Sequence, residues 1–229
     1  MQPTMAQVKA VGEAEATASI QPIGRLEATA AYSPAPHLLL TVGGTVCPKL
    51  GSKRFLVTRQ YELAAGSYLP LGSFWLLNGI GGYGQAVTNR GSQDLGFILG
   101  STHNEYNARY NKLFAQAGIA HSKTNRSFGF TYRLTQVRFS TLIDTDLGEL
   151  PLPNMLRHEA LFFIRRPLGN SSQWETQATM GMSVSSTPRR DDKQGAPGYG
   201  AAEYQANRTL LPALYTSIGL VYRPHWGNQ

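Results

Sequence analysis

Hydrophobic and polar positions alternate with a period of two along most of this chain. The clearest run, QWETQATMGMSVS from Gln173 to Ser185, places Met180 and Met182 on one face and Glu175 and Gln177 on the other. A period of two indicates a β-strand with one apolar and one polar face. A tilted strand of about 9–11 residues can cross a bilayer, and this run is long enough to do so.

The same alternation recurs between turn signals along the chain. It predicts an all-β protein with about ten strands, each joined to the next along the chain. A count between 8 and 12 strands also fits the pattern. The expected strands are Val11–Ile20, Arg25–Tyr32, His37–Val46, Arg59–Leu69, Phe74–Val87, Tyr106–His121, Phe128–Thr135, His158–Arg166, Gln173–Ser185 and Leu214–Arg223.

The connections between these strands alternate in length. After the second strand they run long, short, long, short, with long polar segments at 88–104, 144–157 and 186–208. Up-and-down membrane barrels have short periplasmic turns and longer extracellular loops, and an even strand count places both termini at the periplasmic end. The pattern therefore predicts a single antiparallel up-and-down transmembrane β-barrel. A soluble lipocalin-like barrel has the same strand order but no reason for this asymmetry of loops.

Ionisable residues in mid-strand separate the membrane barrel from the soluble barrel. Burying several charges in an apolar soluble core costs several kcal/mol each unless they are paired. In a narrow membrane barrel they can pair across a polar lumen while apolar residues face lipid. We therefore predict a polar network in the lumen, formed by Glu13, Glu15, Arg25, Glu27, Glu62, Arg133, Glu159, Arg165, Glu175 and Arg223.

The opposite faces of the same strands are expected to contact lipid. The residues predicted to face lipid are Trp174, Met180, Met182, Phe128, Phe130 and Leu220.

Length and composition limit the domain organisation and the partners. The 229 residues suit one barrel domain over 11–226, after a disordered or anchor-proximal segment at 1–10 and before a tail at 227–229. The net charge of +7 comes from scattered residues, which argues against a nucleic-acid partner. A single cysteine, Cys47, excludes an internal disulfide and a Cys-based zinc site.

Membrane-targeting segments are not visible in the sequence. No apolar run reaches 18 residues, so a transmembrane helix is not expected. The start, MQPTMAQVKAVGEAEA, has neither a basic nor an apolar signal region. This counts against export of the chain as it stands, and a start site placed too late or a signal already removed would leave the same pattern.

Several stretches resemble one family. The block YNARYNKLFAQAGIAHSKTNRSFGFTYRLTQVRF, from Tyr106 to Phe139, resembles a pair of strands common in outer-membrane β-barrel proteins of Bacteroidetes. GEAEATASIQPIGRLEATAAYSPAPHLLL resembles the opening hairpin of that family, NGIGGYG its Gly-Tyr strand and LYTSIGLVYRP its last strand. The resemblance implies a small up-and-down barrel in the outer membrane and little about activity. The chain departs from the family in lacking a signal or lipoprotein segment and in ending on HWGNQ.

Candidate chemical motifs each have a simpler interpretation. The glycine-rich run Gly79–Gly84 lacks the Lys-Ser/Thr and the following helix of a phosphate-binding loop. The pairs Ser101 with His103 and His158 with Glu159 suggest catalysis, but residues adjacent in a strand, such as His158 and Glu159, point to opposite faces. The histidines show no metal-ligand spacing, and Asp144 with Asp146 fits a solvated loop better than a Ca²⁺ site. We expect no cofactor, no metal and no enzymatic activity.

Two functional hypotheses follow. The first is a structural or surface-interaction barrel whose lumen is closed by Glu/Arg pairs, with outer-membrane lipids around it and a possible external ligand at the long loops. The alternative is a narrow pore or a barrel that binds a lipid or amphiphile, or a soluble carrier if the membrane interpretation fails. The pore hypothesis draws on small residues expected to face inward, Ala64, Gly66, Gly118, Gly129, Gly181 and Gly219. The sequence leaves the oligomeric state open.

Overall fold

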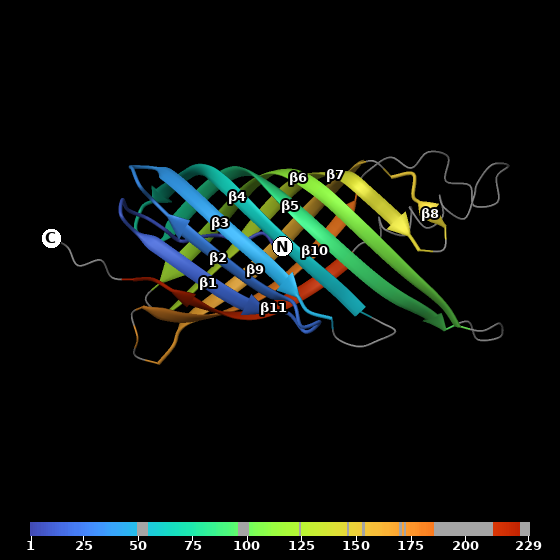
Figure 1. Cartoon of the computed structure of the whole chain (residues 1–229). Coiled ribbons are helices and arrows are strands. Elements are labelled where there is room, and N and C mark those ends of the chain that lie inside the picture. Colours follow the sequence, from blue (N-terminus) through green and yellow to red (C-terminus); the bar gives the residue numbers. More distant parts are fainter. Residues whose placement is uncertain are drawn as a thin grey trace.

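The computed structural model describes residues 1–49, 55–95, 101–123, 125–145, 147–152, 154–169, 171, 173–185 and 213–224, and most of them form β-strands (Figure 1). Among these residues no helix has the length and apolarity needed to cross a membrane. The strands are β1 (Ala14–Ile20), β2 (Leu26–Tyr32), β3 (Leu38–Cys47), β4 (Phe55–Leu71), β5 (Trp75–Leu95), β6 (Ser101–Lys123), β7 (Arg126–Asp144), β8 (Gly148–Glu149), β9 (Asn154–Pro167), β10 (Trp174–Ser185) and β11 (Ala213–Tyr222).

Antiparallel pairing closes ten of these strands into a barrel. Each long strand pairs with its neighbours in the sequence, and β1 pairs with β11 to close the ring. The two-residue strand β8 pairs with the end of β7 and lies outside this ring. A closed ring has no free edge, so every strand finds hydrogen-bond partners on both sides. The predicted fold class, an antiparallel up-and-down barrel of about ten strands, is confirmed.

The two ends of the barrel differ in the length of their connections. One end, called here the short-turn end, carries the segments 33–37, 72–74, 124–125 and 168–173, the start of β1 and the end of β11. The other end, called the loop end, carries the segment 21–25 and the last described residues of β3, β5, β7 and β10. Figure 1 shows the long strands β5, β6 and β7 extending furthest toward the loop end.

One of the predicted loops is largely strand, and a second is partly strand. β5 continues to Leu95 and β6 begins at Ser101, within the segment predicted as a loop at 88–104. β8 and the start of β9 occupy part of 144–157, and the segment 186–208 lies outside the described residues. The sequence pattern failed here because the ladder of backbone hydrogen bonds continues beyond the apolar band, where both faces of a strand can be polar.

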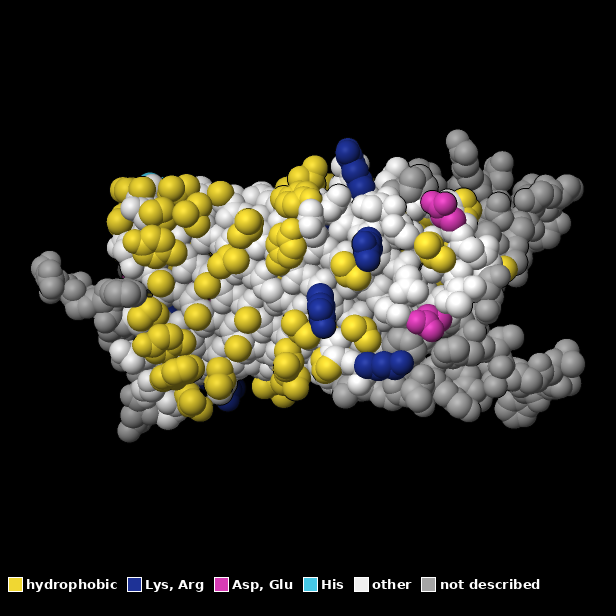
Figure 2. All heavy atoms as spheres, in the orientation of Figure 1, with side chains coloured by type: hydrophobic (Ala, Val, Ile, Leu, Met, Phe, Trp, Pro, Cys, Tyr) yellow, Lys and Arg dark blue, Asp and Glu magenta, His cyan; other side chains and the backbone are white. Residues whose placement is uncertain are grey.

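The outer wall is apolar and the lumen is mostly polar. Met180 is 65% exposed on the outer wall, whereas its neighbour Thr179 is 7% exposed and faces inward. Figure 2 shows apolar side chains over the part of the wall near the short-turn end. All six residues predicted to face lipid lie on the outward face: Trp174, Met180, Met182, Phe130 and Leu220 are exposed, and Phe128 is half-buried against His121.

Aromatic residues border this apolar band at both ends. At the short-turn end, Trp174 lies against Tyr222 and Trp75 against His121, with ring centroids 4.6 and 4.7 Å apart. Toward the loop end, outward-facing tyrosines bond to amides of neighbouring strands. Tyr61 donates to Gln85 (2.5 Å), and Tyr83 donates to Asn111 (3.1 Å). Such paired aromatic girdles mark the two interfaces of a membrane barrel.

Candidate functional site

The first residues of the chain lie inside the barrel. The N-terminal segment, residues 1–13, turns back at Gly12, whose positive φ of 81° suits glycine. Met5 and Val8 are 1% and 2% exposed. We predicted a disordered or anchor-proximal segment at 1–10, and the structure places these residues in the lumen instead. No local pattern predicts this placement, because apolar and polar residues do not alternate in the segment.

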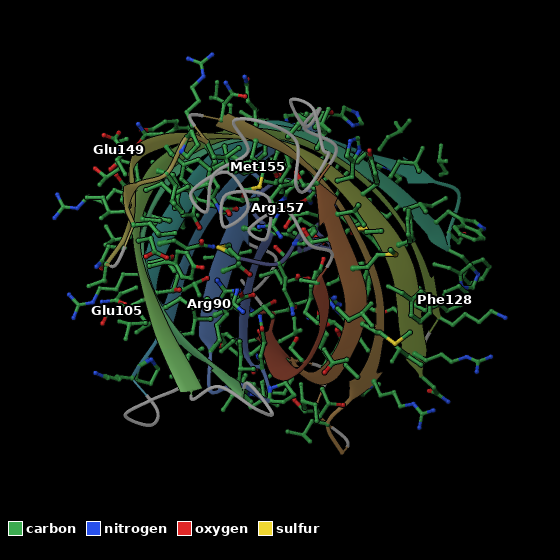
Figure 3. All side chains as sticks on the ribbon, turned by 90° about the vertical axis from the view of Figure 1, so that its right-hand side faces the viewer. Arg90, Glu105, Phe128, Glu149, Met155 and Arg157 are labelled. Carbon is green, nitrogen blue, oxygen red and sulfur yellow. The ribbon has the colours of Figure 1, made fainter. Side chains whose placement is uncertain are left out.

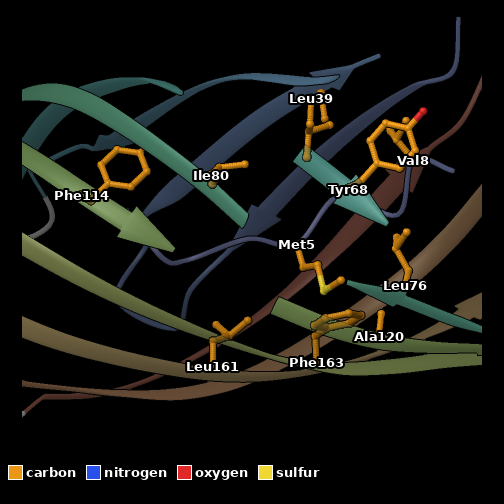
Figure 4. Close-up of a cluster of buried hydrophobic side chains, with 11 residues drawn as sticks. Met5, Val8, Leu39, Tyr68, Leu76, Ile80, Phe114, Ala120, Leu161 and Phe163 are labelled. Carbon is orange, nitrogen blue, oxygen red and sulfur yellow. The ribbon is translucent and has the colours of Figure 1, made fainter. Parts of the chain in front are cut away.

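An apolar cluster in the lumen holds the side chains of this segment. Figure 4 shows Met5 close to Phe163, and Val8 beside Tyr68. Burial of an apolar side chain stabilises by about 1.5–3 kcal/mol, so both residues anchor the segment. The buried members of the cluster are Met5, Val8, Ala31, Leu39, Tyr68, Leu76, Ile80, Phe114, Ala120, Leu161 and Phe163.

The lumen also recognises the backbone of the segment. Three side chains from different strands donate to successive carbonyls: Gln116 to Thr4 (2.7 Å), Arg165 to Met5 (2.9 Å) and Asn78 to Ala6 (3.3 Å). Two carboxylates accept from its amides: Glu27 from Gln2 (3.1 Å) and Glu15 from Gln7 (3.1 Å). The lumen therefore binds the segment as it would bind an extended peptide.

The Glu62 cluster is the first of two ion clusters in the lumen, and it consists of Glu62, Lys112, Arg133 and Gln116. The Glu62 carboxylate accepts from Arg133 Nη1 at 3.0 Å and from Lys112. Arg133 also donates to Gln116 (2.8 Å) and lies over the ring of Phe114. All of these side chains are buried, so two cations share one carboxylate inside the barrel.

Glycines in β5 provide the space for this cluster. A Cβ atom on Gly84 would lie 2.9 Å from Glu62 Cγ and from Lys112 Cε, and one on Gly82 would lie 2.5 Å from Phe114 Cζ. The glycine-rich run that resembled a phosphate-binding loop therefore lies within a strand and makes room for lumen side chains.

The Glu15 cluster is the second, and it consists of Glu15, Arg165, Arg223, Glu175 and Gln177. Glu15 Oε2 accepts from Arg165 and from Arg223, each at 3.0 Å. Arg165 also donates to Gln177 (2.7 Å), and Arg223 pairs with Glu175 at 3.1 Å. These residues come from β1, β9, β10 and the residue after β11, so the cluster joins both sides of the seam between the first and last strands.

The other predicted network residues lie apart from these two clusters. Glu27 is buried and accepts from Gln21, with Arg25 Nε at 3.7 Å near the loop end. Glu159 faces the lumen and accepts from Thr135 (3.1 Å). Glu13 is a correction to the prediction: it is exposed at the rim, because the strand begins only after the turn that it closes by accepting from the Lys9 amide.

Pattern analysis missed several residues that hold the lumen together. Lys112 and Gln116 face inward on β6, where they alternate with Phe114 on the same face. Because apolar and polar residues share this face, alternation along the sequence does not reveal that the face points into the lumen. The glutamines Gln2 and Gln7 were missed because the segment that carries them has no periodicity.

The loop-end mouth of the lumen is lined by basic and apolar side chains. Looking into this end, Figure 3 shows Met155, Arg157 and Arg90 over the interior, while Glu105 and Glu149 lie outside the wall. Arg157 donates to Ser183 (3.0 Å). Met155 belongs to a second apolar cluster with Val137, Leu142, Leu150 and Leu152.

The remaining candidate motifs are not assembled into a site among the described residues. His158 lies outside against Tyr132, whereas Glu159 points inward. Asp144 accepts from the Leu147 amide (3.0 Å), and Asp146 lies outside the described residues. The side chains of Ser101 and His103 are also not among those that the structure describes. Within the described part of the chain no three metal-ligating side chains gather.

These features define a β-barrel of the outer-membrane type: a closed ring, an apolar outside between two aromatic girdles, and a packed polar lumen. No protein-family model and no curated protein matches the chain. Among solved structures, it is similar to the crystal structure of Acinetobacter baumannii CarO. The two share 9% identity and a TM-score of 0.26, and the match covers 91% of this chain and 96% of that one. So distant a likeness supports no argument about function, and the resemblance to the Bacteroidetes family stays a prediction.

Proposed function

We propose that this protein is a sealed outer-membrane barrel with a structural or surface-interaction role and no catalysis. The observation that carries the proposal is the N-terminal segment in the lumen, bonded by Gln116, Arg165 and Asn78. A cavity of about 20 Å³ beside the segment is large enough for about one water molecule. An open aqueous path needs far more space.

The alternative of a narrow pore or small-ligand barrel has less support. The small inward-facing residues that suggested it do not border free space. A Cβ atom on Gly118 would lie 2.9 Å from Met5 Sδ, one on Gly129 would meet Phe163, and one on Gly181 would meet Tyr215. Larger side chains use the room that the glycines leave.

A surface-interaction role is supported by the shape of the loop end. The strands β5, β6 and β7 extend past the aromatic girdle, so their loop-end residues stand away from the apolar band. An external ligand would meet these strand ends first.

Ion conductance in planar bilayers tests whether the lumen is sealed. We expect the full chain to be silent and a variant lacking residues 2–8 to conduct small ions. A matched control replaces Gln7 and Ser127 by cysteine in a Cys47→Ser background and joins the two thiols with a short bifunctional reagent, which spans the gap that the longer Gln7 side chain fills when its Nε2 lies 3.0 Å from Ser127 Oγ. The cross-linked protein should also be silent. Stable channels from the full chain or from the cross-linked protein would refute the proposal.

A further inference from the structure

Three arginines form a row on the outside of the barrel, called here the arginine belt: Arg59, Arg109 and Arg138. They lie on β4, β6 and β7, and all three are exposed. Arg59 is two residues closer to the loop end than Tyr61, and Arg109 is two residues closer than Asn111. Arg59 and Arg109 therefore lie just beyond the loop-side girdle, and Arg138 lies level with it, opposite Asn111. Figure 2 shows lysine and arginine side chains crossing the wall where the apolar band ends.

The belt has no carboxylate beside it in the strand ladder. Arg59 and Arg109 both lie opposite Val87 on β5, and Arg138 lies opposite Asn111 and Asn154. None of the ion pairs between described residues involves the belt. The lumen arginines of the Glu62 and Glu15 clusters are all paired. No described residue supplies a carboxylate partner for the belt, which leaves room for a partner from the surroundings of the barrel.

The position of the belt identifies that partner. Where the apolar band of a membrane barrel ends, lipid headgroups begin, and a guanidinium group binds phosphate through two parallel hydrogen bonds. We propose that the arginine belt binds the phosphate groups of anionic glycolipids in the leaflet at the loop end. This inference is independent of whether the lumen is sealed.

Lipid binding to the full chain in zwitterionic micelles tests this assignment. The probe is lipid A carrying two phosphates, compared with the same glycolipid after its phosphates are removed, and bound lipid is counted by native mass spectrometry. The belt variant combines Arg59→Gln, Arg109→Gln and Arg138→Gln. A control variant combines Lys123→Gln, Arg126→Gln and Arg166→Gln, which removes the same charge from exposed positions at the short-turn end.

Each basic residue near an anionic surface contributes about a factor of five in affinity. We therefore expect the belt variant to bind lipid A about a hundredfold more weakly, and the control variant to bind it like the parent. Should the belt variant fail to fold, Arg109→Gln against Arg126→Gln gives the same comparison at about fivefold. Equal weakening in belt and control variants would overturn the proposal. So would equal binding of the phosphate-free glycolipid, or displacement of lipid A by millimolar inorganic phosphate, which would indicate a free-anion site.

Discussion

The Glu62 and Glu15 clusters use the same kinds of side chain for different purposes. In the Glu62 cluster the charged side chains bond one another across β4, β6 and β7, and only the neutral Gln116 hydrogen-bonds the N-terminal segment. In the Glu15 cluster three charged side chains bond the segment: Glu15 accepts from the Gln7 amide, Arg165 donates to the Met5 carbonyl and Arg223 donates to the Gln7 side chain. The Glu62 cluster therefore joins strands of the barrel wall, and the Glu15 cluster also holds the N-terminal segment in the lumen.

This difference predicts that stability and closure of the lumen can be separated. Removing one partner of a buried ion pair is costly because a charge is left without compensation. When both partners only join strands of the wall, the loss lowers the stability of the barrel. When the partners also bind the N-terminal segment, part of the loss weakens the binding of that segment in the lumen. Three substitutions test this separation.

The largest effect is expected from Glu62→Ala. This change leaves Lys112 and Arg133 buried without a carboxylate, and it should lower the free energy of unfolding by about 3–5 kcal/mol. Urea unfolding in micelles measures it. Glu149→Ala, an exposed position at the loop end, is the control and should change little. A small loss for Glu62→Ala would show that water compensates these charges and that the cluster does not hold the wall.

A smaller effect is expected from Arg165→Met. Glu15 keeps Arg223, but Gln177 and the Met5 carbonyl each lose a donor, so the loss should be about 1–3 kcal/mol. Amide hydrogen exchange at Gln7 should rise more than in the Glu62→Ala variant, because the segment is loosened directly. Equal exchange at Gln7 in the two variants would show that the Glu15 cluster holds the N-terminal segment no more directly than the Glu62 cluster does.

The smallest effect is expected from Gln116→Leu. It removes the donor to the Thr4 carbonyl and the acceptor of Arg133 Nε and Nη2, while Arg133 keeps its pair with Glu62. About 1–2 kcal/mol should be lost. Gln136→Leu, on the outward face of β7, is the control. Thermal unfolding followed by gel mobility measures both. A loss as large as that of Glu62→Ala would mean that the amide, and not the ion pair, holds the first cluster.

Parity along the strands was enough to predict which side of the barrel most residues face. Met180 lies outside and Glu62, Arg133 and Arg165 lie inside, because alternation in a half-polar strand has a single physical solution once one face meets lipid. The strand count followed from the same pattern.

Parity could not predict what fills the lumen. The N-terminal segment is held by bonds from β5, β6 and β9, and such long-range partners leave no local pattern. The inward face near the short-turn end is apolar where Phe163 and Leu76 pack on Met5 and Val8, which breaks the rule of a polar inner face. The sequence pattern also ended β5 too early and began β6 too late, since a strand outside the bilayer has no reason to alternate.

The seam between β1 and β11 is the mechanically weakest line of the barrel. Its described ladder runs only from Ala16 to Ile20, whereas the ladder between β5 and β6 runs from Trp75 to Leu95. Under heat or pulling force the ring should unzip at this seam first, since the fewest backbone bonds share the load there. The ion pair between Arg223 and Glu15 joins the two strands across the seam, and the N-terminal segment enters the lumen beside it. Opening of the seam between β1 and β11 should therefore release the N-terminal segment from the lumen at the same time.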